Sequence, residues 1–237
     1  MNRWTVAAAW AVLLWACGPE GGLPANGNPV TEPEVPQDVD PAEASRDTLW
    51  PLIDGSRWVY RIESETDGVF QKVVTVEGEE AIPGTEGGRG ILVSSVQPDR
   101  EERSWQVFSN GVALRLREED IRLGRLDQVM TWTPSVTKSL GAVVAPGFVH
   151  EETVREIVRS AAGDVVDDKQ KSFRWVVEAV EPISTPAGDF PEALRVRRVR
   201  TDKPDWERLY WLVPGVGKVR EEGPRTETLI EVSIPEA

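Results

Sequence analysis

Apolar and polar residues alternate with a period of two along most of residues 57–234, and this alternation constrains the fold more than any other feature. Near its start, Trp58, Tyr60 and Ile62 occupy every second position. Near its end, Ile230 and Val232 do the same. Successive side chains of a β-strand point to opposite faces, so each run places one face in a core and the other toward water. The pattern therefore predicts half-solvated antiparallel sheet.

Turn signals such as Asp67-Gly68, Asn110-Gly111 and Pro214-Gly215 divide this region into about a dozen short strands. Helix is expected only at residues 43–49 and, interrupted by a glycine, at residues 118–126. Without alternating helices a parallel βαβ sheet is excluded. We predict an all-β fold with minor helix, in which about a dozen antiparallel strands form a curved half-barrel or barrel-like single domain. Further alternating runs are Val112, Leu114 and Leu116, and Phe173, Trp175, Val177 and Ala179.

One strand breaks the alternation. Leu194 and Val196 are two residues apart and so share one face of the strand, whereas Val199 falls on the opposite face. Arg197-Arg198 lies between Val196 and Val199. A single inserted residue produces such a slip, and insertions of this kind are common where a curved sheet bends. We therefore predict a β-bulge at Arg197-Arg198.

The chain begins with the layout of a secretion signal. Arg3 precedes an uncharged apolar stretch at residues 4–16, which is too short to span a bilayer. Leu14, Ala16 and Cys17 resemble the bacterial lipobox, although Trp15 stands where a small or β-branched residue is usual. The resemblance implies that Cys17, the only cysteine of the chain, carries the lipid and that residues 1–16 are removed. The alternative is an ordinary cleaved signal peptide with a leftover thiol. Because Gly18 is not Asp, the resemblance also implies the outer membrane, on its periplasmic face by default.

Residues 17–48 are predicted to form a disordered tether behind the lipidated cysteine. Prolines and glycines are frequent there, and residues 20–48 hold seven acidic residues against one basic residue. Such a segment buries too little apolar surface to offset the entropy of ordering. Residues 49–237 remain for a single antiparallel β domain, which has a size typical of one domain.

The charge of the chain limits its partners. The formal net charge is −13, and the chain is therefore acidic overall. An acidic domain on an acidic tether repels phosphate backbones, so nucleic acid is not expected as a partner. We expect no cofactor and no metal.

Two segments resemble a family of bacterial exported lipoproteins, the DUF3108-like or TapB-like domains. The first is PLIDGSRWVY at residues 51–60, and the second runs from TPAGDF at residues 185–190 to YWLVPGVGKV at residues 210–219. The resemblance implies an antiparallel β-fold related to the curved sheets of periplasmic lipoprotein carriers. It implies no catalytic residues. The motifs themselves suit folding: Gly55 provides a turn, and Trp58, Tyr60 and Trp211 are able to plug a curved sheet.

Few residues suggest catalysis or metal binding. His150 is the only histidine, and it is expected on a partly solvated strand face. Asp164, Asp167 and Asp168 lack the spacing of a calcium loop and are interpreted as an acidic hairpin tip. We therefore expect no catalytic residues, and the protein is not expected to be an enzyme. A hydrolase is the third and least favoured hypothesis.

Two binding hypotheses remain. In the first, a non-catalytic, lipid-anchored envelope lipoprotein holds an apolar ligand or acyl chain within its curved sheet, with Trp58, Tyr60, Trp175 and Trp211 as candidate contacts. In the second, Arg195, Arg197 and Arg198 dock another envelope protein as part of assembly. The structural alternative for these arginines is cross-strand pairing with acidic neighbours such as Glu178, Glu181 and Glu207.

The anchor is tested by Cys17→Ser. We expect an unlipidated product, uncleaved or soluble, because the serine hydroxyl does not replace the thiol as acceptor of the lipid. Membrane fractionation and intact-protein mass spectrometry measure the change. A variant that stays with the outer membrane at the wild-type mass would contradict the lipoprotein prediction.

Overall fold

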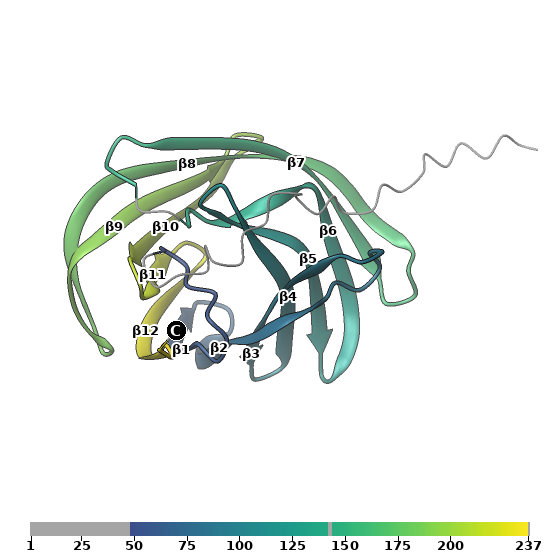
Figure 1. Ribbon diagram of the computed structural model, residues 1–237, viewed down its shortest axis with the longest axis horizontal. Coiled ribbons are helices and arrows are strands. Elements are labelled where there is room, and N and C mark those ends of the chain that lie inside the picture. The colour runs from purple at the N-terminus through teal and green to yellow at the C-terminus, as the bar shows by residue number, and fades with distance from the viewer. Residues whose placement is uncertain (1–47, 142–143, 237) are drawn as a thin grey trace, which may run out of the picture. The chain divides into compact units, whose positions relative to one another are not determined.

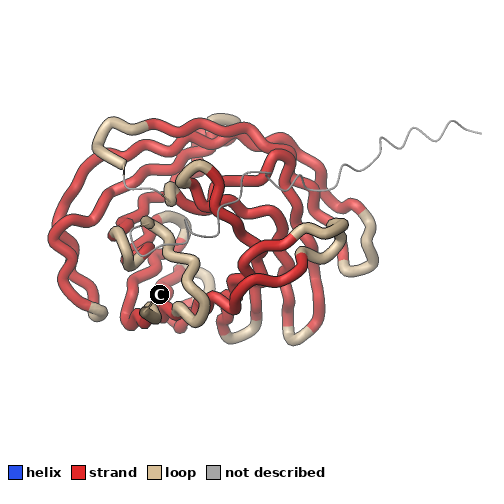
Figure 2. Tube along the Cα trace, in the orientation of Figure 1, coloured by secondary structure: helices blue, strands red, loops and turns tan. Residues whose placement is uncertain are grey.

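The structure, a computed structural model, describes residues 48–141 and 144–236. All of these residues lie in one unit that spans residues 31–237. They form twelve strands and no helix (Figures 1 and 2). The described part of the chain accordingly offers no helix long and apolar enough to cross a membrane. The all-β prediction is confirmed, whereas the predicted signal segment, Cys17 and nearly all of the tether lie outside the described residues.

The strands form one closed antiparallel barrel. Each strand pairs with its neighbours in sequence, and β1 also pairs with β12, which closes the ring. Of the two predicted shapes, the barrel is therefore the correct one. The strands are β1 (Arg57–Ser64), β2 (Gly68–Ala81), β3 (Arg89–Gln97), β4 (Arg100–Ser109), β5 (Val112–Arg122), β6 (Arg125–Ser139), β7 (Val149–Ser160), β8 (Val165–Thr185), β9 (Gly188–Arg200), β10 (Lys203–Val213), β11 (Gly217–Glu222) and β12 (Arg225–Ser233).

The predicted helix at residues 118–126 is wrong. These residues complete β5, turn, and begin β6. Leu123 and Gly124 both have positive φ, at 49° and 74°, as a tight hairpin turn requires. Glu118 and Asp120 are buried although they are charged, and this hides the strand pattern of β5 from the sequence. Of the other predicted helix, residues 43–49, the structure describes only the last two, which lie in a bend.

The predicted bulge at Arg197-Arg198 is also wrong. Both residues pair in continuous register with β8 and β10. The bulge lies instead in the neighbouring strand, between Val177 and Ala179. The apolar alternation of β9 breaks because Arg198, two residues after Val196, occupies the next inward position, and its side chain lines the interior.

Two other bulges change the predicted core. In β5 a register shift relative to β4 occurs at Leu116, and Ala113 is buried in place of its predicted neighbours Val112 and Leu114. In β12 a shift relative to β1 leaves Ile230 unpaired, and Leu229 is fully buried. Since one extra residue reverses the face of every residue after it, neither change is visible from the period alone.

The largest apolar cluster joins β1 to the segment before it. Trp58 and Trp50 stack with ring centroids 5.3 Å apart and planes 9° from parallel. Trp58 Nε1 donates to the carbonyl oxygen of Val216 at 2.6 Å, and Trp50 Nε1 donates to Gln106 Oε1 at 3.0 Å. The Leu49 amide donates to the carbonyl oxygen of Gly141 at 2.7 Å. Two rings of this size bury a large apolar area, so the cluster fixes the segment before β1 to the barrel.

A matched pair of leucines tests this core. Leu229 is 0% exposed, whereas Leu123 is 85% exposed. Leu229→Ala leaves a cavity, and we expect the free energy of unfolding to fall by about 2–5 kcal/mol. Leu123→Ala is expected to change it by less than about 0.5 kcal/mol. Chemical denaturation measures both, and equal losses would contradict the assigned core.

Candidate functional site

The interior of the barrel contains a cavity of about 550 Å³. Residues from every strand except β3 line it, so the cavity is the lumen of the barrel. Its lining includes six carboxylates: Asp67, Glu102, Glu118, Glu156, Glu221 and Glu227. It also includes nine lysine and arginine side chains: Lys72, Arg100, Arg115, Lys138, Lys171, Arg198, Arg208, Lys218 and Arg225. The lumen thus carries a formal excess of three positive charges inside a chain whose net charge is −13.

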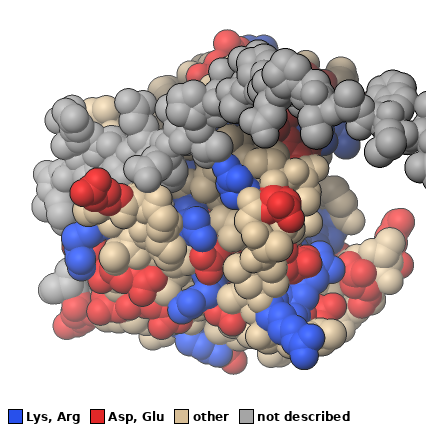
Figure 3. All heavy atoms as spheres, turned by 90° about the vertical axis from the view of Figure 1, so that its right-hand side faces the viewer, with Lys and Arg blue, Asp and Glu red and all other residues tan. Residues whose placement is uncertain are grey.

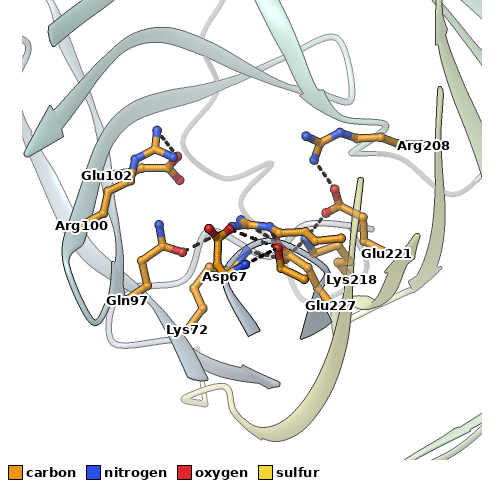
Figure 4. Close-up of polar contacts among 11 residues, drawn as sticks. Asp67, Lys72, Gln97, Arg100, Glu102, Arg208, Lys218, Glu221 and Glu227 are labelled. Carbon is orange, nitrogen blue, oxygen red and sulfur yellow. Dashed lines mark hydrogen bonds and ion pairs between the residues drawn. The ribbon is translucent and has the colours of Figure 1, made fainter. Parts of the chain in front are cut away.

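Glu227 is the centre of the largest ion-pair network in the lumen (Figure 4). Its carboxylate lies 2.6 Å from Lys218 Nζ and also contacts Lys72 Nζ. Arg225 approaches its other oxygen at 2.8 Å. Lys218 additionally contacts Glu221, which pairs with an arginine of β10. One carboxylate of β12 therefore holds cations from β2, β11 and β12 together across the closure of the barrel.

This network shifts the pKa of its members in directions set by their surroundings. Burial opposes the charge on Glu227, but Lys218 and Lys72 outweigh it and hold the pKa of this carboxyl well below its usual value. Burial also opposes the charge on Lys218, but Glu221 and Glu227 raise its pKa above the usual value. Lys72 has one carboxylate partner, so burial and the nearby Lys218 lower its pKa to about 8. The network is thus held charged chiefly around Glu227 and Lys218.

A second group of charges lies on β4 and β5. Arg100 pairs with Glu102 at 2.8 Å and with Asp120 at 2.6 Å. Arg115 contacts Glu118. Burial raises the pKa of Glu118, which Arg115 only partly offsets. By contrast, Arg100 and then Arg115 overcome burial and lower the pKa of Glu102. These groups offer alternating donors and acceptors to a polar molecule in the lumen.

Aromatic rings form another part of the lining, around Arg198. Its guanidinium carbon lies 4.0 Å from the ring centroid of Phe173 and 4.5 Å from that of Trp175. Tyr210 stacks on Trp175 at 5.6 Å, and Trp206 meets Phe173 edge-on at 5.9 Å. Stacking on ring faces stabilises a guanidinium that has its nearest carboxylate, Glu152, 3.8 Å away. This part of the lumen suits flat groups as well as charged ones.

The residues predicted as site candidates do not form one site. Trp175 and Arg198 line the lumen. Trp58 and Tyr60 are fully buried in the main core, and Tyr60 Oη donates to the carbonyl oxygen of Lys218 at 2.8 Å. Trp211 belongs to the same core, and its indole donates to Glu181 at 2.8 Å. The tryptophans thus divide between core and lumen.

The arginines divide as well. Arg195 pairs with Glu178 at 3.1 Å and with Glu181 at 3.0 Å, and Arg197 pairs with Glu207. These are the three acidic neighbours considered for cross-strand pairing. On the face seen in Figure 3, basic and acidic residues likewise lie interspersed.

His150 lies where β6 and β7 separate. The two strands pair only from Gln128 to Thr133 on β6, and Pro134 has no N–H to continue the ladder. Farther along, the amide and hydroxyl of Thr137 both donate to Glu152 Oε2 at 2.9 Å. Thr137 Oγ1 also lies 3.0 Å from His150 Nε2, within hydrogen-bond distance. This contact therefore bridges the seam between the strands.

The acidic cluster near the β7–β8 turn also forms ordinary pairs. Asp168 accepts hydrogen bonds from Nε and Nη2 of Arg155, at 2.8 and 2.6 Å, and Asp167 pairs with Lys169 at 2.8 Å. Within residues 48–141 and 144–236, no group of three or more His, Cys, Asp and Glu side chains is placed to hold a metal ion.

Sequence reasoning missed most of the lumen. The missed residues are charged, and each lies two positions before a buried apolar residue, on the same inward face of its strand. Lys72 precedes Val74, Lys171 precedes Phe173, and Glu227 precedes Leu229. The alternation of apolar and polar residues alone does not assign such charges to the interior. The spacing of two residues from a buried apolar residue is the signal that identifies a charged side chain of the lumen.

Comparison with known proteins adds the following. No family model matches the chain, and no curated protein matches it. One similar solved structure is a candidate exported protein of Bacteroides fragilis with a YmcC-like fold, with a TM-score of 0.47 and 13% identity over 76% of this chain and 96% of that chain. Another is a candidate lipoprotein of Parabacteroides distasonis, with a TM-score of 0.48 and 15% identity over 79% of this chain and 99% of that chain. The family suggested by the two sequence motifs stays a prediction.

Glu227→Gln tests the network. The substitution keeps the shape of the side chain but leaves Lys218, Lys72 and Arg225 without the negative charge that they share. We therefore expect the free energy of unfolding at pH 7 to fall by about 3–5 kcal/mol. The pKa of Glu227 is lowered by folding, so its contribution is present above the unfolded value of about 4.3 and is lost as the pH falls through the folded value. Denaturation between pH 3 and pH 7 measures the gap between wild type and variant, which should narrow at acid pH.

The control for this test is Glu231→Gln on the same strand. Glu231 forms an exposed pair with Arg57 at 3.4 Å, which is worth at most about 1 kcal/mol. If the two variants were equally stable at pH 7, or if the gap stayed constant down to pH 3, the assigned role of Glu227 would be wrong.

Proposed function

We propose that this protein is a lipid-anchored lipoprotein of the bacterial outer membrane, on the periplasmic face, that binds a small polar molecule in its lumen without transforming it. The observation that supports binding is the cavity of about 550 Å³, which lies within the usual range for ligand pockets. The lipobox-like residues around Cys17 support the anchor, and the two family-like motifs support export.

The lining favours a polar ligand over the acyl chain expected from the sequence. Charged side chains from most of the strands face the cavity, and most of them are paired through ion pairs and hydrogen bonds. An alkyl chain placed among them would separate these groups from water without replacing any hydrogen bond. A molecule with its own donors and acceptors avoids this cost.

Docking through the arginine face has less support. Arg195 and Arg197 already have carboxylate partners on neighbouring strands, and Arg198 lies inside the barrel. A protein partner would have to displace those carboxylates for little gain, because exposed ion pairs are weak. Docking remains the alternative that the experiment below separates from ligand binding.

The test is native mass spectrometry of the full chain released gently from its membrane. We expect a co-purifying small molecule, and we expect Trp206→Ala to lose it, because Trp206 lines the lumen but is only partly buried in the core. Arg197→Glu should retain it, because Arg197 is exposed and does not line the lumen. A clean apo mass for the wild type, or loss of the molecule only in Arg197→Glu, would contradict the proposal and favour docking.

A further inference from the structure

Lys138 differs from every other cation of the lumen. The other eight each lie within 4 Å of at least one carboxylate. Lys138 forms no ion pair with any residue that the structure describes. Its recorded contact is with the ring of Trp50, whose centroid lies 5.0 Å from Nζ. Lys138 also lines both the main cavity and a smaller adjoining cavity of about 50 Å³.

The carboxylates nearest Lys138 are already paired: Glu102 with Arg100, Glu118 with Arg115 and Glu221 with Lys218. Burial lowers the pKa of its ammonium well below the usual value, and the nearby Arg115, Lys218 and Lys72 lower it further. Each of these neighbours already shares its charge with a carboxylate of its own. An ammonium group without an ion-pair partner is unfavourable in such a place, and an added anion stabilises its charged form without breaking an existing pair.

We propose that Lys138 binds the acidic group of the ligand, and that the ligand is a flat organic anion. This inference rests on the proposed function, since it assigns the ligand class of the same lumen. The rings of Trp132, Phe173 and Trp206 line the cavity that Lys138 faces, and they offer surfaces for a planar group. Carboxylate, sulfonate and phosphate share the required chemistry, which is a compact negative charge that accepts hydrogen bonds from an ammonium group.

A pair of fluorescent probes tests the inference. 1-Anilinonaphthalene-8-sulfonate and N-phenyl-1-naphthylamine share one ring skeleton, and only the first carries an acidic group. Titrations use the full chain with Cys17→Ser throughout, which keeps lipid out of the sample. We expect the sulfonate to bind at least about tenfold more tightly than the neutral amine, as expected for a charge-assisted hydrogen bond. Lys138→Gln should remove about tenfold of the sulfonate affinity and leave the affinity for the amine unchanged.

Lys203→Gln is the matched control, because Lys203 is exposed and forms no ion pair with the described residues. It should bind both probes as the wild type does. Lys138→Gln should also unfold at a denaturant concentration equal to or higher than that of the wild type, since it removes a lysine that has no ion-pair partner among the described residues. A folded Lys138→Gln variant that binds the sulfonate as tightly as the wild type overturns the role of Lys138 and leaves lumen binding intact. A wild type that binds the amine as tightly as the sulfonate overturns the anionic ligand, and one that binds neither overturns the proposed function as well.

Discussion

Twelve strands closed into a ring enclose more space than apolar side chains fill, and the rest of this structure depends on that constraint. Barrels of eight strands are filled by their own side chains, whereas barrels of sixteen or more leave an aqueous channel. Here Trp50, Trp58 and their neighbours form the main apolar core, and a cavity of about 550 Å³ remains. Charged side chains line this remainder. Most of them are stabilised by pairing with an opposite charge.

Burial inside the barrel explains which ion pairs contribute most to the stability of the fold. Glu227 holds Lys72, Lys218 and Arg225 next to the β1–β12 pairing, where the two ends of the sheet meet. Closing a barrel removes its strand edges, and with them the tendency to pair with other chains. On the outer face, pairs such as Arg57–Glu231 are largely exposed and contribute little. The same residue types thus have different energetic consequences on the two faces of one sheet.

The sequence predicted the strands and several turns well, because both depend on local chemistry. Asn110-Gly111, for example, provides the positive φ angles that join β4 to β5. The candidate site was predicted poorly, because inward parity was equated with apolar character. Glu118 therefore suggested a helix and Arg198 a bulge, although both continue an inward face. The closure of the barrel and the bulge at Ile230 depend on pairing between distant segments, which no local pattern contains.

The acidic chain encloses a basic lumen. The chain carries −13 overall, whereas the lumen has a formal excess of three positive charges. Outer charges act over about 8 Å at physiological ionic strength, so a small anion is little hindered, whereas a polyanion or an anionic surface meets many of them at once. Inside the lumen, the low dielectric constant of the walls strengthens the attraction between opposite charges, so the ammonium group of Lys138 would orient the acidic group of the proposed ligand. For the anionic ligand proposed above, this arrangement would select by size and charge together, because the exterior repels large anions and the lumen attracts small ones.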